Sequence, residues 1–501
     1  MKLFRDEGGD SMSIRKLSAA RLQILTITFF MVICFAFCYL FRSELPECIN
    51  WLGILYFFYA IVTWKTKTND RWFNPYTILQ IFFVAFNYGQ PIMWAFGIHQ
   101  NDEIGKGELF YRAIYSPGKE ELWNVQWYVC LGMLLFHIGA LIVVKTSEVA
   151  FQQQNIISDE DISDEDNNKY TLIKQSMKSV CGILLFVLAP VAIYLRFREM
   201  QIARTYGYKA LYYGANSTQH GYVQILMYLF FPALVGFLIG NDYSKKSRTI
   251  AYTVFGLYTA FGILSGDRGS WLYSLIILIW LHTHYVKTKV KTYITFGVAG
   301  VVAIYFLSAI TTIRNSGLSQ LNINMVLSII AGNESPIVNA FFEMGRSMNV
   351  IAFFLHTGRD IYPYSNTYLT ALLGVVSSRF LQFLGLKQVL IADWFSQDYL
   401  RITWGAGFSM IAEAYVNGGY FGGLIYMCLL GMMHGKILGY TSKKTVHSDP
   451  MRLFVVVAGL NAIIGFVRGA MYLTLKELFY GVFVAALMIC FFGKKGAYRD
   501  K

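Results

Sequence analysis

Charged side chains are scarce in this chain of 501 residues. Asp, Glu, Lys and Arg make up 15% of it, whereas 55% is hydrophobic and 17% is aromatic. A soluble globular protein carries about 25% charged residues. Apolar stretches of about 20 residues recur along the whole sequence, and each is long enough to cross a hydrocarbon core as a helix. The composition therefore excludes a soluble protein and indicates an integral membrane protein.

Reactive cysteine patterns and cleavage signals are also missing. The seven cysteines form no CxxC pair and no spacing with histidine that suits a metal, so we expect small apolar side chains rather than a disulfide or zinc framework. The charged residues 1–21 precede an apolar run without a small-residue cleavage site, which predicts a first helix that stays as a signal anchor. The formal net charge of +13 is expected to orient the chain in the membrane rather than to bind nucleic acid.

Windows of apolar residues predict an all-α, polytopic integral membrane protein, a single membrane domain over residues 1–501 with about twelve transmembrane helices. The predicted spans lie near residues 22–41, 49–64, 75–98, 122–144, 178–195, 222–240, 249–265, 270–286, 293–313, 420–440, 453–468 and 473–492.

The basic residues predict the orientation of the chain. With both termini in the cytoplasm, the cytoplasmic segments hold 26 of the 43 Lys and Arg residues, as the positive-inside rule requires. These segments carry 19 Lys and 7 Arg, whereas the outer segments carry 5 Lys and 12 Arg. Guanidinium offers a planar fork for phosphate or carboxylate. The outer arginines therefore predict an anionic ligand on the outer face, unless they are interfacial anchors or loop ion pairs.

Two segments stand apart from the predicted spans. Residues 147–170 form an acidic cytoplasmic linker with little to bury. Residues 314–419 form a large extracytoplasmic loop that is too apolar to be simply solvated, and we expect it to contain short amphipathic or re-entrant helices. The outer carboxylates show no DxD or HExxH spacing, and the chain has no nucleotide-binding glycine loop. No metal and no cofactor is therefore expected.

Four outer arginines are candidate ligands for an anion. Arg268 lies in the turn Ser-Gly-Asp-Arg-Gly-Ser-Trp, where glycines let backbone approach a ligand; the alternative is a tight turn in which Asp267 pairs with Arg268. Arg314 and Arg468 lie at the outer ends of predicted spans, where they either face the bundle interior as functional groups or snorkel. Arg204 is the favoured member of a basic, tyrosine-rich loop after the fifth span.

Two outer carboxylates are candidate proton acceptors. Glu413 lies in an apolar, glycine-flanked stretch, and such a setting raises the proton affinity of a carboxylate, as a general base near neutral pH requires. Glu343 lies three residues before Arg346, and its alternative role is an ion pair across one helical turn. Outer tyrosines such as Tyr362 and Tyr364 would suit stacking on sugar rings, although an interfacial belt is the commoner use of this residue type.

Several motifs occur together in one part of the chain. They are GDRGSW at the outer turn, GYKALYYG after the fifth span, NAFFEMGRS followed by IYPYSNTY, and GAGFSMIAEAYVNGGYFGG near the C-terminus. Over about residues 200–440, the chain resembles the Wzy-type polymerases of O-antigen, capsule or exopolysaccharide repeat units. Asp267 departs from the serine that is commoner at this place in the family.

The resemblance implies a function. Such proteins transfer a growing glycan from undecaprenyl pyrophosphate onto a lipid-linked oligosaccharide repeat unit, at the outer leaflet of the bacterial cytoplasmic membrane. The expected partners are that lipid-linked oligosaccharide, membrane lipid, a flippase and a chain-length regulator. The outer arginines would hold the pyrophosphate and stabilise it as a leaving group, and the two carboxylates would be catalytic. Residue by residue, the family pattern supports Arg268 for pyrophosphate and Glu413 and Glu343 for catalysis. Arg314, Arg468 and Arg204, chosen from their places in the sequence, would join Arg268 on the pyrophosphate.

Three other classes of protein remain open. A glycan ligase would share the donor and the outer arginines and would differ in its acceptor. A flippase or other transporter of lipid-linked oligosaccharides would show paired repeats or broken helices, with ionisable groups near mid-membrane, whereas the charges here cluster in the outer loops. A receptor or scaffold would need no cluster of outer arginines.

Overall fold

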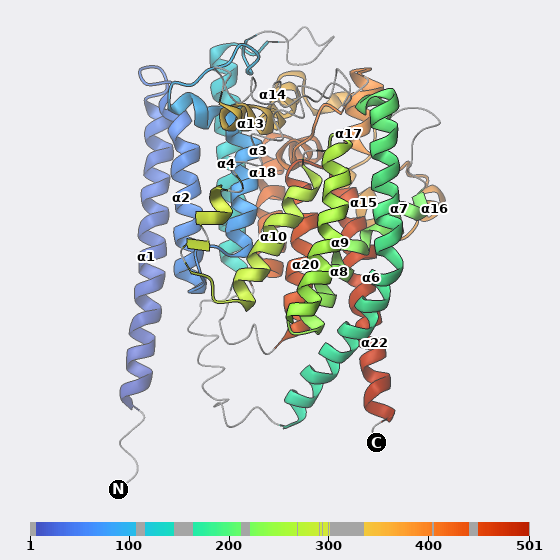
Figure 1. Cartoon of the computed structure of the whole chain (residues 1–501). Coiled ribbons are helices and arrows are strands. Elements are labelled where there is room, and N and C mark those ends of the chain that lie inside the picture. Colours follow the sequence, from blue (N-terminus) through green and yellow to red (C-terminus); the bar gives the residue numbers. More distant parts are fainter. Residues whose placement is uncertain are drawn as a thin grey trace.

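The protein is a bundle of long helices with a layer of short helices over one end (Figure 1). The computed structural model describes residues 7–106, 116–144, 164–211, 221–267, 269–289, 291–292, 294–298, 300, 335–402, 405–439 and 449–499. Every regular element in those ranges is a helix, because backbone in hydrocarbon must satisfy its own hydrogen bonds. The predicted all-α, polytopic membrane fold is confirmed.

The first part of the chain supplies most of the long helices. The helices of this part, long and short, are α1 (Glu7–Leu40), α2 (Cys48–Thr68), α3 (Pro75–Ala95), α4 (Lys119–Val143), α6 (Asp164–Tyr206), the 3-10 helix η1 (Tyr208–Leu211), α7 (Gly221–Tyr228), α8 (Phe230–Gly240), α9 (Lys245–Leu264) and α10 (Ser270–Tyr285).

The second part begins with short helices and ends with three further segments of the bundle. The short helices are α13 (Pro336–Met344), α14 (Ser347–Thr357), η4 (Arg359–Ile361), α15 (Thr367–Gly374), α16 (Ser378–Phe383), α17 (Ile391–Asp393) and the π-helix η5 (Trp394–Tyr399). The bundle is completed by α18 (Met410–Leu438), α20 (Pro450–Val467), and the run of α21 (Met471–Lys476), the π-helix η6 (Glu477–Phe483) and α22 (Val484–Arg499).

Within the described residues, eight of the twelve predicted spans form helices that are both long enough and apolar enough to cross a membrane. The predicted spans at 75–98, 249–265 and 270–286 also form helices, α3, α9 and α10, which fall short in hydropathy or length. Most of the predicted span at 293–313 lies outside the described residues, as do 147–163 of the predicted linker and 314–334 of the predicted outer loop. The last residues of the predicted linker, from Asp164, belong to α6.

Helix α3 lies in the interior of the bundle, which explains its low hydropathy. It packs against α2, α13 and α20, and its polar side chains Gln80, Asn87 and Gln90 are buried. Buried amides are tolerated where they form hydrogen bonds. Gln80 accepts one of 2.9 Å from the Tyr56 hydroxyl, and Gln90 donates one of 3.0 Å to the Phe342 carbonyl of α13. A central helix of this kind needs no hydrophobic surface for lipid.

Helices α4 and α18 approach each other closely through glycine. A Cβ atom on Gly431 would lie 1.8 Å from the Phe136 carbonyl oxygen, and one on Gly139 would lie 2.1 Å from the Cys428 carbonyl oxygen. Small residues on membrane helices allow such backbone contact. The close contact fixes the position of α18, whose first turn carries Glu413.

Both termini lie at the same end of the bundle, and α13 and α14 lie at the opposite end (Figure 1). We call this opposite end the short-helix end. It is the side on which the sequence places its large outer loop. The location of both termini at one end agrees with an even number of membrane crossings.

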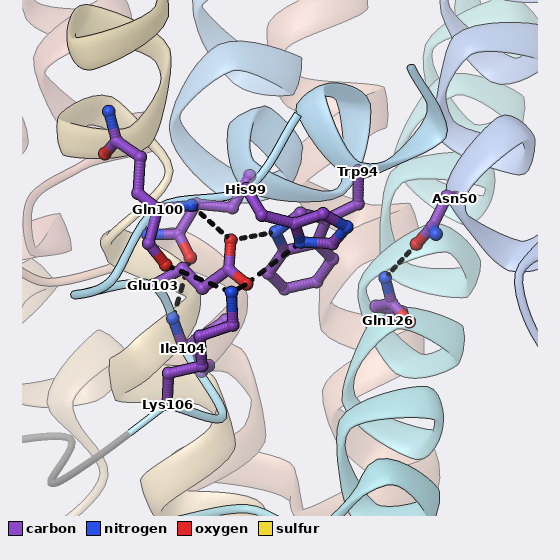
Figure 2. Close-up of polar contacts among 9 residues, drawn as sticks. Asn50, Trp94, His99, Gln100, Glu103, Ile104, Lys106 and Gln126 are labelled. Atoms are coloured by element: carbon purple, nitrogen blue, oxygen red, sulfur yellow. Dashed lines mark hydrogen bonds and ion pairs between the residues drawn. The ribbon is translucent and has the colours of Figure 1, made fainter. Parts of the chain in front are cut away.

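The connection after α3 is fastened to the short-helix end by the buried carboxylate of Glu103 (Figure 2). Trp94 Nε1 donates a hydrogen bond of 2.7 Å to it, the Gln100 backbone N–H donates one of 3.0 Å, and Lys106 Nζ lies 2.8 Å away. Gln100 also donates to the Asn339 side chain on α13. Figure 2 further shows the buried pair Gln126–Asn50, 2.7 Å apart, which links α4 to α2.

The first prediction concerns the orientation of the bundle. Cysteine substitutions Gln397→Cys, at an exposed position of η5, and Lys501→Cys are compared in intact cells with an impermeant maleimide. We expect labelling at 397 and none at 501 until the membrane is opened, because the lysine-rich segments orient towards the cytoplasm. Labelling at 501 alone in intact cells would reverse the orientation.

The second prediction concerns Glu103. Burial raises its pKa, but Lys106, the Gln100 N–H, Trp94 and His99 together outweigh burial, so that the pKa is lowered. A lowered folded-state pKa means that the carboxylate stabilises the fold above its unfolded pKa of about 4.3 and that this contribution is lost as the pH falls through the folded-state value. We therefore expect the melting temperature of Glu103→Gln in detergent to be lower than wild type at neutral pH and to converge with it in acid.

The control for this experiment is Glu44→Gln, which changes an exposed carboxylate. It should follow the wild-type melting curve at every pH. A constant difference between wild type and Glu103→Gln from neutral to acidic pH would show that the ionised carboxylate does not hold this connection.

Candidate functional site

Glu413 is buried at the start of α18, with 1% of its surface exposed. Its Oε1 accepts a hydrogen bond of 2.6 Å from the Thr367 hydroxyl, and its Oε2 accepts one of 2.8 Å from the Met471 backbone N–H. Thr367 begins α15 and Met471 begins α21. One carboxylate therefore joins the starts of three helices that are distant in sequence.

Local sequence explains how α18 begins at this place. Ser409 is the N-cap residue, and its hydroxyl accepts hydrogen bonds from the N–H groups of Ile411 and Ala412, as short polar side chains do at helix starts. The same hydroxyl donates a hydrogen bond of 2.6 Å to Asn87 Oδ1 on α3. The first turn of α18, and Glu413 with it, is thereby held against the central helix.

Asn417 completes the hydrogen bonding around Thr367. Its Oδ1 accepts from the Thr367 N–H at 2.7 Å, and its Nδ2 donates to the Thr367 hydroxyl oxygen at 2.7 Å and to the Glu413 carbonyl at 2.9 Å. The Thr367 hydroxyl thus donates to Glu413 while it accepts from Asn417. A buried polar network in which every member is bonded is rigid. We call Glu413, Thr367, Asn417 and the Met471 N–H the Glu413 network.

Arg468 lies directly after α20 and three residues before Met471. Its side chain is exposed. Its guanidinium carbon lies 5.5 Å from the centre of the Phe86 ring, and within the described part of the chain it makes no hydrogen bond or ion pair. The bond from Met471 to Glu413 therefore fixes the backbone beside a cation whose donors are open to a ligand.

The Glu413 network also affects a neighbouring tyrosine in the connection between η4 and α15. Burial, followed by the charge of the Glu413 carboxylate, raises the pKa of the Tyr362 hydroxyl. Tyr362 therefore stays a neutral donor near the network at physiological pH.

Of the other predicted residues, Glu343 and Arg204 lie apart from the Glu413 network. Glu343 is exposed near the end of α13. The alternative of a Glu343–Arg346 pair across one helical turn is not what the structure has, because α13 ends at Met344 and Arg346 forms an ion pair with Asp102. Arg204 is exposed on the last turn of α6.

Arg268 and Arg314 lie outside the described residues. The residue before Arg268 is described, and Asp267 Oδ2 lies 3.1 Å from Arg196 Nη2 on α6. Asp267 Oδ1 accepts from the Gly269 N–H at 3.2 Å. The turn between α9 and α10 is thus anchored to α6 through an ion pair that the sequence did not indicate.

The described part of the chain has no group of three or more His, Cys, Asp or Glu side chains that could hold a metal ion. Thr367 and Asn417 are the members of the site that the sequence analysis missed. Asn417 had a signal, since it follows Glu413 by four residues and so shares its helix face. Thr367 had none, because it lies 46 residues from Glu413.

The fold and the site define a polytopic helical membrane protein with a buried carboxylate network and an exposed cation at one end of the bundle. A protein-family model described as O-antigen polysaccharide polymerase Wzy matches residues 22–501, and the chain belongs to this family. The match covers nearly the whole chain and supports an O-antigen repeat-unit polymerase that acts on lipid-linked oligosaccharides in the bacterial inner membrane. No curated protein and no solved structure matches the chain.

The third prediction concerns the Glu413 network. Glu413→Ala leaves the Thr367 hydroxyl and the Met471 N–H without their acceptor, and each buried unsatisfied donor costs about 1–3 kcal/mol. We expect a clear fall in melting temperature for Glu413→Ala, a smaller fall for Thr367→Val, and a double variant that is less destabilised than the sum, since both changes remove the same bond. Thermal unfolding of purified protein in lipid nanodiscs measures all three.

Glu44→Ala serves as the control and should melt with wild type, because this carboxylate is exposed. Additive effects of Glu413→Ala and Thr367→Val would show that the two side chains are energetically independent, which would contradict the network.

Proposed function

We propose that the protein transfers a growing glycan from undecaprenyl pyrophosphate onto a lipid-linked oligosaccharide repeat unit at the outer leaflet. In this reaction a hydroxyl oxygen of the acceptor sugar forms a bond to the anomeric carbon of the donor glycan. The bond between that carbon and the pyrophosphate oxygen breaks, undecaprenyl pyrophosphate leaves with the electron pair, and the hydroxyl proton passes to a base.

The observation that carries the proposal is the environment of Arg468. A leaving pyrophosphate gains negative charge, and donors already aimed at that charge stabilise the transition state. Arg468 offers an exposed guanidinium without an acidic partner in the described part of the chain, beside backbone held by Glu413. Guanidinium binds phosphate oxygens in bidentate fashion. Arg268, Arg314 and Arg204 remain proposed as further ligands of the same anion.

The two proposed carboxylates suit different tasks. Glu413 is buried and both of its oxygens are hydrogen-bonded, which supports a positioning role, namely to hold the segment that carries Arg468. Glu343 is exposed near the end of α13, and a general base that meets a substrate must be exposed. We therefore propose Glu343 rather than Glu413 as the proton acceptor.

The fourth prediction tests Arg468. Purified protein in lipid is given undecaprenyl-pyrophosphate repeat units, and the products are separated on a gel, where polymerisation gives a ladder of multiples. Loss of a charge-assisted hydrogen bond costs about 1.5–3 kcal/mol, so Arg468→Ala should polymerise about ten- to a hundred-fold more slowly. Arg468→Lys should recover part of the loss, because it keeps the charge without the planar fork.

The matched control is Arg379→Ala, which removes an exposed arginine of the short helix α16 and should leave the ladder unchanged. If Arg468 only snorkelled, the lysine variant would polymerise as fast as wild type. Full activity of Arg468→Ala would remove Arg468 from the reaction, and absence of a ladder from folded wild-type protein with the native repeat unit would contradict the proposed function itself.

A further inference from the structure

A polar pocket of about 280 Å³ opens beside the Glu413 network. Its lining comes from η4 and the connection to α15, which supply Arg359, Asp360, Tyr362, Tyr364 and Ser365, and from α18, which supplies Asn417. We call it the Arg359 pocket. Small-molecule sites commonly measure about 300–1,000 Å³, so this volume suits a single small ring rather than an oligosaccharide.

The inner wall of the pocket is rigid. Asn417 belongs to the Glu413 network, and its amide is bonded to Thr367 and Glu413. Asn366, also in the wall, is the N-cap of α15 and accepts hydrogen bonds from the N–H groups of Tyr368 and Leu369. These amides hold the shape of the pocket, so the other lining groups would recognise a ligand.

The remaining polar groups of the pocket are open to a ligand. Within the described residues, the hydroxyls of Tyr362, Tyr364 and Ser365 make no hydrogen bond to the protein. The nearest acidic group to Arg359 is Asp360, whose Oδ1 lies 3.8 Å from Arg359 Nε, and the Asp360 side chain is 99% exposed. The pocket thus presents a donor, an acceptor and three hydroxyls that can do both.

Charge separates this pocket from the environment of Arg468. Arg359 and Asp360 are adjacent, so their charges offset each other and the lining itself offers little to a polyanion such as pyrophosphate. A neutral polyol is favoured instead, because its hydroxyls bond to both partners. Half-buried aromatic rings also line the pocket: Tyr362 meets Tyr364 edge to face with centroids 5.5 Å apart. Such rings offer an apolar surface for the C–H face of a pyranose.

Position relative to Glu413 indicates which sugar would bind. Oε2 of Glu413 holds the segment after Arg468, where the proposed function places the donor pyrophosphate, whereas Oε1 holds Thr367 and, through it, the pocket wall. The same carboxylate thus holds both the segment after Arg468 and the wall of the Arg359 pocket. We propose that the Arg359 pocket binds one sugar ring of the acceptor repeat unit. The identification of that sugar as part of the acceptor rests on the proposed function, whereas the binding of a sugar does not.

Binding is tested separately from turnover, and this is the fifth prediction. The probe is the free repeat-unit oligosaccharide released from the native polymer, without lipid or phosphate, added to purified full-length protein in nanodiscs and followed by saturation-transfer NMR. Wild type should transfer saturation to the sugar protons, and Asp360→Asn and Tyr364→Ala should bind about ten-fold more weakly. Asp360→Asn alters a fully exposed side chain, so it keeps the test valid if Tyr364→Ala does not fold.

Arg379→Ala is the matched control and should bind like wild type. In the polymerisation assay, the pocket variants should raise the KM for the acceptor about ten-fold while kcat changes little, since the lost sugar contact is equally strong in the ground state and the transition state. Unchanged binding by both pocket variants, no saturation transfer from wild type, or displacement of the sugar from wild type by inorganic pyrophosphate would each overturn the pocket assignment. Sugar binding that depends on Asp360 in a protein that forms no ladder would retain the pocket and overturn the proposed function.

Discussion

The buried carboxylate of Glu413 is the interaction on which the arrangement of the proposed site depends. Transfer of a carboxylate out of water costs several kcal/mol unless hydrogen bonds replace its hydration. Here the Thr367 hydroxyl and the Met471 N–H do so, one at each carboxylate oxygen. Because those partners begin α15 and α21, which also pack against each other, one buried carboxyl group links both helices to the start of α18.

The same constraint gives the proposed reaction its geometry. Arg468 lies on one of the two held segments, and the Arg359 pocket is built on the other. Glycosyl transfer between two lipid-linked substrates needs donor and acceptor at fixed relative positions, and a rigid support contributes to the rate by orientation. Helix α18 suits this task because its N-terminal turn is capped against α3 by Ser409 and its later turns pack closely on α4 through Gly431.

Hydropathy predicted the long helices well, because each span of a membrane helix must be apolar over its whole length. It also predicted the interior helix α3, near residues 75–98, although this helix carries the buried amides Asn87 and Gln90. The start of α18 was placed near residue 420, whereas the helix begins at Met410 and includes a break at Gly419, whose φ is 67°. A kinked helix whose first turns continue an already apolar loop shows no change of hydropathy at its start.

The site was predictable in part. Glu413 stood out as a carboxylate in an apolar stretch, and Arg468 stood out as a cation at a span end. Their connection through Met471, and the bond from Glu413 to Thr367, join residues 58 and 46 positions apart, and no periodicity relates such positions. The alternative of a Glu343–Arg346 ion pair is wrong because α13 ends at Met344, before Gly345, and Arg346 forms its ion pair with Asp102. Local spacing predicts a pair only where one helix carries both residues.

The most direct test of the account is a cryo-electron microscopy structure of the protein in nanodiscs with the undecaprenyl-pyrophosphate repeat unit bound. We expect phosphate density within hydrogen-bonding distance of Arg468 and sugar density against Tyr362 and Tyr364. Glu413 should still be bonded to Thr367 and Met471 without touching either substrate. Phosphate density in the Arg359 pocket, or a Glu413 carboxylate released from Thr367 to contact a sugar hydroxyl, would contradict it.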